Sequence, residues 1–514
     1  MDAKPPVTHS PRTIAALLER GAADATALSA PAGVPLTYAQ LRSLVSDTGA
    51  ALESVGIGAN DRVAIVLDNG PEAAAAFLSI GACATAAPLN PGYRADEFEF
   101  YLTDLKAKAL VVARGKESPA VAVADRLGVP VARLVPRPGE GAGSFVLELS
   151  GGSASERPVR PASPDDIALV LHTSGTTSRP KMVPLSHRNV CASAENVRAS
   201  LVLDAGDRGL CILPLFHIHG LIAALLAPLA AGGEVCCSPG FNALKFFSWM
   251  AEVRPTWYTG VPTMHQAILA RASKNAEVVS SSRLRFIRSS SSSLPPTVLE
   301  QLESVFGVPV IEAYGMTEAA HQMASNPLPP SRRKPGTVGI SAGPDIRVMD
   351  ERGEPAPAGT AGEIVIRGEN VMTEYERHPE ANAAAFVRGW FRTGDQGAFD
   401  ADGYLTITGR LKEIINRGGE KISPREVDEI IMEHPAVHQC VTFAVPHDML
   451  GEDVAAAVVL REGASASDAE LRRFAAQRLA DFKVPRKILI LPEIPTGATG
   501  KLQRIGLAKK LGLT

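Results

Sequence analysis

A nine-residue segment rich in hydroxyl groups is the most chemically suggestive part of the sequence. The segment TSGTTSRPK follows an apolar run and holds five hydroxyl side chains, one glycine, one arginine and one lysine. Small hydroxyls and backbone N–H groups can line a polyphosphate, while the cations offset its charge. A solvated turn of the same composition is the simpler alternative. We predict a phosphate-binding loop whose contributing residues are Thr173, Ser174, Gly175, Thr176, Thr177 and Lys181.

This loop does not follow the pattern of P-loop nucleotidases. The pattern GxxxxGK[ST] requires a glycine before the lysine and a hydroxyl residue after it. Here Pro180 precedes Lys181 and Met182 follows it. The P-loop interpretation therefore fails at two positions.

The elements around the loop predict a helix-covered, mostly parallel sheet. Helical stretches, such as the one from Thr37, alternate with short apolar runs such as RVAIVLD and ALVVAR. Such alternation is typical of βα units. The run 167–173 reads as a buried strand that ends in the loop, and we expect a helix from Ser186, whose serine is a good N-cap. The Gly-, Ser- and Pro-rich stretch 139–163 reads as a surface connection.

The last third of the chain has a different texture. From Ile346 onward, short alternating runs separated by glycines predict an antiparallel β region. After Gly409, two helical stretches near 424–434 and 467–479 and the strands CVTFAV and AAAVVL suffice for a compact α+β domain. We place the boundary within 409–413.

Composition excludes several classes of protein. The 52 Lys plus Arg against 55 Asp plus Glu give a formal net charge of -3 over 514 residues, so nucleic acid is not an expected partner. Six scattered cysteines without a CxxC pair suggest neither a disulfide framework nor a zinc site. The start of the chain lacks the apolar core of a secretory signal, and no apolar stretch approaches the roughly 20 residues of a membrane span. We expect a cytoplasmic protein and leave its oligomeric state open.

Further segments identify the chain by resemblance. TSGTTSRPK resembles the phosphate-binding signature of the adenylate-forming superfamily, which includes acyl-CoA synthetases. EAYGMTE (312–318), GWFRTGD (389–395), the stretch 409–428 and PTGATGK (495–501) resemble its other blocks, in the expected order. The resemblance covers nearly the whole chain. It implies an N-terminal adenylation core over 1–409, a hinge at 410–412 and a mobile C-terminal domain over 413–514.

The resemblance also assigns nucleotide contacts. Thr317 would offer a hydroxyl to the α-phosphate, and Glu318 would offer Mg²⁺ the hard oxygen that it prefers. Asp395 and Arg410 would contact the ribose. Each also has a plainer interpretation, as a helix start, a turn aspartate or a solvated linker cation. The EAYG residues complete the predicted ATP and AMP contacts: Glu312, Ala313, Tyr314 and Gly315.

Two basic segments near the C-terminus receive roles in the same way. Lys501 lies in a Gly/Thr-rich loop and would contact the acid and the α-phosphate during adenylation, where it relieves the repulsion of two anions. Lys412 corresponds to the hinge. Arg417, Gly418 and Gly419 correspond to the CoA tunnel, although the two glycines could simply form a tight turn.

Three polar features lie where this superfamily binds its acid. His217 and His219 alternate, so on an extended segment they would share a face. Five serines follow each other within 288–294. His321 follows Glu318 by three residues, which would place both on one side of a helix.

Histidines and serines together favour a pocket that holds a second anionic group. We predict that His217, Ser291 and His321 bind the acid, although a structural or gating histidine and a coincidental cluster remain the alternative. Among acyl-CoA synthetases the pattern is most similar to the oxalate:CoA ligases of plants and fungi. The unbroken run of five serines departs from that family and leaves open which hydroxyl makes the contact.

The resemblance implies a two-step ligase that uses ATP, Mg²⁺ and coenzyme A. A carboxylate and ATP would give an acyl-adenylate and pyrophosphate, and the CoA thiol would then displace AMP. With oxalate the products are oxalyl-CoA, AMP and pyrophosphate. Alternatives are a ligase for medium-chain fatty or aromatic acids, an adenylation domain that loads a carrier protein, and a non-catalytic binding protein with the same fold.

Overall fold

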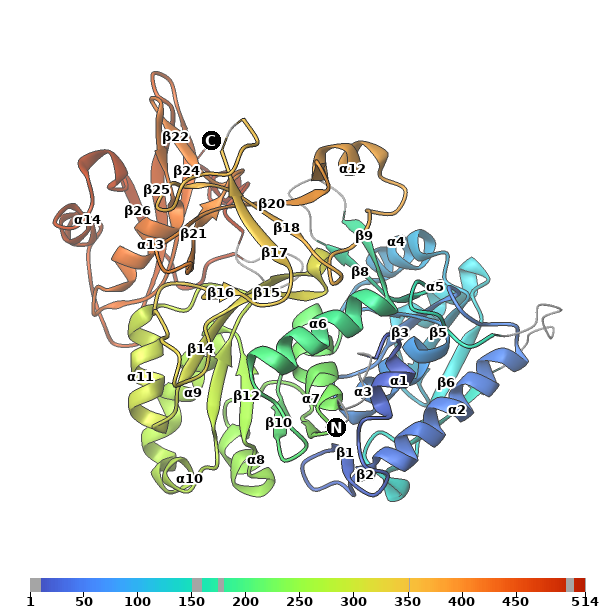
Figure 1. Ribbon diagram of the computed structural model, residues 1–514. Helices are drawn as coiled ribbons and strands as arrows, with labels where there is room; N and C mark the ends of the chain where they lie inside the picture. The colour runs from blue at the N-terminus through green and yellow to red at the C-terminus, as the bar shows by residue number, and fades with distance from the viewer. Residues whose placement is uncertain (1–10, 150–159, 174–179, 351, 496–502, 514) are drawn as a thin grey trace, which may run out of the picture. The chain divides into compact units, whose positions relative to one another are not determined.

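The computed structural model describes residues 11–149, 160–173, 180–350, 352–495 and 503–513 (Figure 1). The chain forms two compact units. The first contains the described residues up to 173, Lys181–Asp345 and Arg367–Ala384. The second contains Pro180, Ile346–Ile366 and the described residues from Ala385 onward. The predicted hinge at 410–412 therefore lies inside the second unit, and its role stays a prediction.

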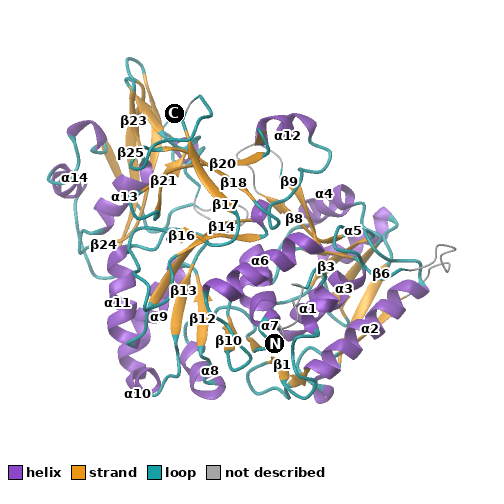
Figure 2. Ribbon diagram, in the orientation of Figure 1, coloured by secondary structure: helices purple, strands orange, loops and turns teal. Residues whose placement is uncertain are grey.

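A seven-stranded sheet forms one half of the first unit (Figure 2). Its five central strands are parallel, and the two edge strands are antiparallel to their neighbours. Their order across the sheet is β7 (Phe145–Leu149), β6 (Val131–Pro136), β5 (Ala109–Ala113), β3 (Arg62–Val66), β4 (Thr85–Pro88), β8 (Ile167–Thr173) and β9 (Lys181–Ser186).

A nine-stranded sheet forms the other half of this unit. Six consecutive strands, from β1 to β14 across the sheet, are parallel. The order is β16 (Ile340–Ser341), β15 (His321–Ser325), β14 (Val310–Met316), β13 (Phe286–Ser289), β12 (Trp257–Gly260), β10 (Arg208–Cys211), β11 (Glu234–Cys237), β1 (Thr26–Ser29) and β2 (Leu36–Thr37).

Helices cover these sheets, as the βα alternation predicts. Thr37 caps α2 with a full capping box, because its hydroxyl and the Gln40 side chain satisfy each other's backbone N–H groups. Ser186 caps α6 in the same way, and α6 packs against β8, β9 and β15. The helices of this unit are α1 (Ile14–Leu18), α2 (Tyr38–Ser54), α3 (Pro71–Cys83), α4 (Ala95–Leu105), α5 (Pro119–Leu127), α6 (His187–Ser200), α7 (Ala227–Ala230), α8 (Phe246–Val253), α9 (Pro262–Ala272), α10 (Ala276–Ser280), α11 (Pro296–Phe306) and α12 (Pro379–Ala385).

The second unit contains two smaller sheets. The antiparallel β region predicted from Ile346 is confirmed as β17 (Asp345–Met349), β18 (Gly362–Arg367), β20 (Trp390–Phe399), β19 (Phe386–Val387) and β21 (Leu405–Arg410). The predicted α+β segment is confirmed as a second sheet with α13 (Pro424–Met432) and α14 (Asp468–Ala476), followed by α15 (Leu507–Lys510). Its strands are β23 (Glu420–Ile422), β22 (Ile415–Arg417), β25 (Gly451–Leu460), β24 (Val437–His447) and β26 (Lys487–Ile490).

Two local predictions are wrong. The stretch 139–163 is not a plain connection, because β7 within it pairs with β6. The loop after β8 does not lead directly into a helix, because β9 intervenes and pairs back onto β8. Among the described helices, none is long and apolar enough to cross a bilayer.

Candidate active site

The predicted phosphate loop joins two paired strands. Thr173 at the end of β8 is in register with Lys181 at the start of β9, so both described ends of the loop lie side by side. The Lys181 ammonium lies 4.1 Å from the centroid of the Tyr375 ring, a cation–π contact that orients this long side chain. Four predicted loop residues and the predicted adenylation lysine lie outside the described residues: Ser174, Gly175, Thr176, Thr177 and Lys501.

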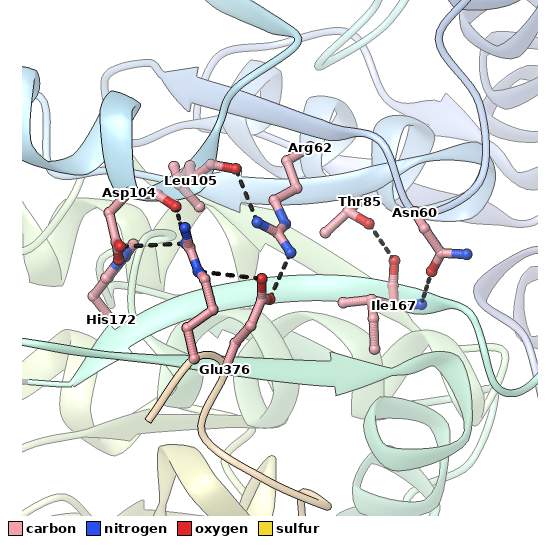
Figure 3. Close-up of polar contacts among 9 residues, drawn as sticks. Asn60, Arg62, Thr85, Asp104, Leu105, Ile167, His172 and Glu376 are labelled. Atoms are coloured by element: carbon pink, nitrogen blue, oxygen red, sulfur yellow. Dashed lines mark hydrogen bonds and ion pairs between the residues drawn. The ribbon is translucent and has the colours of Figure 1, made fainter. Parts of the chain in front are cut away.

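Polar contacts fix both ends of β8 (Figure 3). At its start, the Ile167 N–H donates to Asn60 Oδ1 at 2.7 Å, and the Ile167 carbonyl accepts from the Thr85 hydroxyl at 2.6 Å. At its end, His172 Nε2 lies 2.9 Å from Asp104 Oδ2, and this hydrogen bond is the main cause that lowers the pKa of Asp104. The strand that delivers Thr173 is therefore anchored one residue before the loop begins.

The segment 367–384, which comes back to the first unit after residues 346–366, joins the same network of contacts. Arg62 donates to Glu376 Oε2 at 2.5 Å and to the Leu105 carbonyl at 3.0 Å (Figure 3). Arg377 forms an ion pair with Asp104 at 3.3 Å. These contacts hold residues 376–377, next to Tyr375, against the seven-stranded sheet.

The candidate metal ligand is a buried carboxylate held by a tyrosine. Glu318 is 7% exposed, and its Oε1 accepts a hydrogen bond from the Tyr375 hydroxyl at 2.8 Å. Burial, assisted by the nearby charge of Glu318, raises the pKa of Tyr375, so this hydroxyl stays a donor. Mg²⁺ typically takes one or two protein carboxylates and completes its shell with water and phosphates, and a single oriented carboxylate fits that need.

The predicted helix from Glu318 to His321 is wrong. Thr317–Ala319 forms one 3-10 turn, and His321 begins β15, which pairs with β14. Ala320 and His321 have φ values of 46° and 96°, which few residues other than glycine adopt. The strained backbone turns the His321 side chain away from the path that a helix would give it.

His219, rather than His217, contacts the predicted serine. His219 Nδ1 lies 2.9 Å from Ser291 Oγ, and its Nε2 lies 2.7 Å from Thr259 Oγ1. The segment before it is a turn and not an extended strand, and His219 begins a π-helical stretch (His219–Leu226), so the two histidines do not alternate on one face. His217 is partly buried against the Phe216 ring, and its contact with the acid stays a prediction.

Two histidine rings share one buried arginine. The rings of His219 and His321 are stacked, with centroids 4.7 Å apart and planes 12° apart. Arg288 is 0% exposed and donates to Nε2 of both rings at 3.0 Å. Burial lowers the pKa of Arg288 to about 9, so the guanidinium keeps its charge at neutral pH. Burial and this charge together push the pKa of His321 well below its ordinary value.

The five serines differ in where they point. Ser289 and Ser290 are both 0% exposed, and Ser290 donates to the Ala313 carbonyl at 2.8 Å. Ser291 is exposed, with a φ of 73°. A left-handed conformation in a residue other than glycine is strained, and such strain gathers at functional sites. Ser291 is therefore the serine best placed to offer a hydroxyl beside the histidines.

The four residues Glu312–Gly315 lie in β14, which pairs with the strand that begins at His321. Glu312 Oε1 accepts the Leu294 N–H at 3.0 Å, which fixes the end of the serine segment. A Cβ on Gly315 would lie 1.8 Å from the His321 carbonyl oxygen, so only glycine fits there. The nucleotide contacts of Glu312, Ala313, Tyr314 and Gly315 stay predictions.

Two predicted ribose contacts meet within the second unit. Asp395 of β20 is in register with Arg410 of β21, and Arg410 Nε lies 3.3 Å from Asp395 Oδ1. Asp395 is 8% exposed, which suits a carboxylate that accepts hydrogen bonds from two hydroxyl groups of one ligand. Lys412 is exposed in the turn that follows, and its hinge role stays a prediction.

The predicted CoA segment is a tight hairpin. Gly418 and Gly419 join β22 to β23 with φ values of 58° and 95°, which confirms the tight turn as their local structure. Arg417 donates to Asp453 Oδ1 at 2.7 Å. A role for these residues in CoA binding stays a prediction.

Two family profiles match the sequence of this chain. The profile described as AMP-binding enzyme matches residues 17–376, and the AMP-binding enzyme C-terminal domain matches residues 426–501. The chain belongs to the AMP-binding enzyme family. The predicted superfamily and the predicted α/β fold with a smaller C-terminal domain are thereby confirmed.

This AMP-binding enzyme has full-length relatives. It is 45% identical to an oxalate–CoA ligase of Arabidopsis thaliana over 507 residues, which cover 96% of this chain and 97% of that protein. It is 42% identical to an oxalate–CoA ligase of Saccharomyces cerevisiae, over 87% and 86% of the two chains. Among solved structures, ATP-bound MatB from Rhodopseudomonas palustris is 31% identical, with a TM-score of 0.86 over 97% of this chain and 98% of that one.

Sequence reasoning missed Arg288, Thr259 and Tyr375 of the candidate site, and it chose His217 where the structure places His219 against Ser291. Arg288 directly follows the apolar pair Phe286 and Ile287 in β13, and a charged residue within such a short strand was the available signal. Thr259 and Tyr375 carry no such signal, because only the register of β12 and the return of residues 367–384 bring them to the site.

Proposed function

We propose that this enzyme is an ATP-dependent carboxylate:CoA ligase and that its acid is oxalate. The first step joins one oxalate carboxylate to the α-phosphate of ATP and releases pyrophosphate. In the second step the CoA thiol attacks the acyl carbon, and AMP leaves with the bonding electron pair. Membership of the AMP-binding family and the two oxalate–CoA ligase relatives support this proposal.

The cluster of His219, Ser291 and His321 beneath Arg288 is the observation that carries the choice of acid. A fatty or aromatic tail would give no hydrogen-bond acceptor to the Ser291 hydroxyl or to the buried His321 ring, and a buried donor left without a partner costs about 1–3 kcal/mol. A second carboxylate accepts hydrogen bonds from them instead. We therefore place the distal carboxylate of oxalate against Ser291 and His321.

Each part of the nucleotide has its own set of proposed contacts. Lys181 and the hydroxyl loop that begins at Thr173 neutralise and bind the phosphates, and Asp395 with Arg410 binds the ribose. Glu318, held by Tyr375, would ligate a Mg²⁺ ion, which offsets the phosphate charge when it is bound. Positioning and charge neutralisation then carry the reaction without a covalent enzyme intermediate.

Lys501 and the CoA residues complete the proposal. The Lys501 ammonium relieves the repulsion between the attacking carboxylate and the α-phosphate during adenylation. Movement of the C-terminal segment about Lys412 then withdraws it, and the Gly418–Gly419 turn lets the pantetheine arm of CoA pass close to the backbone.

Pyrophosphate release with oxalate, malonate, octanoate and coumarate tests the acid. We expect the highest kcat/KM with oxalate. A kcat/KM for octanoate or coumarate equal to that for oxalate would overturn the assignment. Loss of the free CoA thiol in step with pyrophosphate release separates a CoA ligase from an adenylation domain that loads a carrier protein.

A further inference from the structure

Arg288 is a fully buried cation. It lies on β13 in register with Thr259 of β12, so both side chains point to the same face of the sheet. Within the described residues, no carboxylate is recorded in an ion pair with Arg288. Glu312 lies on the neighbouring strand β14, where it is in register with Ser289 rather than with Arg288. The Glu312 side chain therefore points to the opposite face of the sheet.

The hydrogen bonds of this guanidinium are all to neutral acceptors. Arg288 donates to His219 Nε2 and His321 Nε2 at 3.0 Å each, to Gln322 Oε1 at 3.0 Å and to Thr259 Oγ1 at 3.4 Å. The stacking of the two rings allows one planar guanidinium to reach both. Arg288 is 0% exposed, so it acts on any ligand through these rings.

A guanidinium has only donors, and this fact determines where the imidazole protons lie. A guanidinium N–H that points at Nε2 leaves no place for a proton there, so each neutral ring carries its proton on Nδ1. On His219 the Thr259 hydroxyl, 2.7 Å from the same Nε2, must then also donate to it. On His219 the Nδ1–H then donates to Ser291 Oγ, 2.9 Å away. Because the serine oxygen accepts this bond, its own O–H is available to donate to a third group.

We propose that Arg288 is a positioning residue that holds His219 and His321 as their Nδ1–H tautomers, so that Ser291 and His321 offer only donors to the distal carboxylate of the acid. This inference rests on the proposed function for the identity of the acid. It deepens that function, because a doubly charged acid also balances the buried cation better than a monocarboxylate with an apolar tail.

The arrangement favours recognition by neutral donors instead of by histidinium. Among the described residues, two charged or titratable groups contact the His321 ring. Arg288 of β13 donates to its Nε2, and the ring of His219 stacks on it. Burial of the ring, and then the adjacent cation, disfavour a positive charge on His321. Oxalate binding should therefore require no proton uptake by this ring near neutral pH.

The first test reads the tautomers directly in the ligand-free, full-length protein. We expect 15N spectra of histidine-labelled protein at pH 7.5 to show a protonated Nδ1 and a bare Nε2 for both rings, assigned by loss of signals in H219Q and H321Q. A protonated Nε2 on either ring would overturn the proposal. This readout needs no turnover, so it stands even if oxalate proves not to be the acid.

The second test compares variants by the pH dependence of KM for oxalate. Wild type should have a nearly constant KM between pH 6.5 and 8, within the range where an ordinary histidine titrates. In R288M, which removes the charge and the donors of this side chain, we expect a KM about tenfold higher that rises further with pH, because loss of the cation removes one of the two causes that lower the pKa of His321. R288K should restore part of the flat profile, since it returns a cation with donors.

R285M is the matched control. Arg285 lies three residues earlier and forms an ion pair with Asp207 at 2.7 Å, away from both histidines. Its loss should leave the KM profile unchanged. A flat profile in folded R288M, or the same shift in R285M, would contradict the role of Arg288; if R288M does not fold, the tautomers of the wild-type protein decide.

Discussion

The imidazole rings of His219 and His321 lie face to face, with centroids 4.7 Å apart, although 102 positions separate them in the chain. His219 begins a π-helical stretch and His321 begins β15, so the contact depends on the tertiary structure alone. Because this pair lies at the proposed acid site, changes there should alter the acid and spare the nucleotide.

His321→Ala tests that separation. Removal of a ring that binds the distal carboxylate should lower kcat/KM for oxalate by about tenfold to a hundredfold, in keeping with the loss of one hydrogen bond to a charged group. The KM for ATP should change little. Pyrophosphate release at varied oxalate and varied ATP measures both, with the exposed His438→Ala as control. An equal rise in both KM values would contradict the assignment.

Ser291→Ala tests which serine contacts the acid. Its exposed hydroxyl lies against His219, so we expect a loss of about tenfold or more in kcat/KM for oxalate. Ser292→Ala removes the hydroxyl of the next exposed serine and should have little effect. Activity of the two variants measured in parallel decides, and a larger loss in Ser292→Ala would shift the contact by one residue.

Tyr375→Phe tests the carboxylate held for Mg²⁺. The substitution keeps the ring beside Lys181 and removes the hydroxyl that donates to Glu318. Loss of a group that orients a metal ligand typically weakens metal affinity about 10–100-fold, so a Mg²⁺ titration of activity should show a higher half-saturation concentration. Tyr38→Phe removes a comparable buried hydroxyl, bonded to the Gly233 carbonyl, and should leave the titration unchanged.

Lys501→Ala tests the two half-reactions separately. Adenylation, measured by exchange of labelled pyrophosphate into ATP, should fall at least about 100-fold, since the cation stabilises the transition state of that step. Thioester formation from supplied acyl-adenylate should persist. Lys509→Ala and Lys510→Ala serve as controls from the same end of the chain. Comparable damage to both half-reactions would refute the assigned role.

His187 gives a prediction for stability against pH. Its Nδ1 accepts the Ile14 N–H at 3.2 Å, and burial lowers its pKa from 6.5 to about 4. Between these values the unfolded chain binds more protons, so the free energy of unfolding should fall as pH falls from 6.5 to 4. This one group contributes up to about 3 kcal/mol of that loss.

His187→Asn should flatten this acid slope, because the amide oxygen can still accept the Ile14 N–H but does not titrate. Urea unfolding at several pH values from 7 to 4 measures the slope. The exposed His438→Asn is the control. Identical slopes in wild type and His187→Asn would exclude a contribution from this histidine.

Much of the fold could be predicted because the sequence signals are local. Thr37 and Ser186 cap their helices as expected, and the apolar runs of β3, β5 and β8 form parallel strands. The strand β9 was missed because it contains Pro184, which disfavours a strand interior. The strand is recognised only from its antiparallel pairing with β8 across the loop, which local sequence signals do not show.

The site was only partly predictable for a related reason. Ser291 and His321 were proposed from residue type and family resemblance, and their contact with the acid stays a prediction. The helix expected between Glu318 and His321 fails because Ala320 turns the chain at positive φ. The choice of His219 and the role of Arg288 depend on strand register, which a single sequence does not supply. A spacing of three residues favours a helix only while the backbone continues one.

The path of residues 367–384 has a practical consequence for dissecting the protein. The chain leaves the first unit after Asp345, returns for this stretch and leaves again after Ala384. A truncation at 345 would delete Glu376 and Arg377. Arg62 and Asp104 would then lose these ion-pair partners. No single scission can liberate either half intact, so any attempt to study the halves separately must rewire the connectivity of the polypeptide.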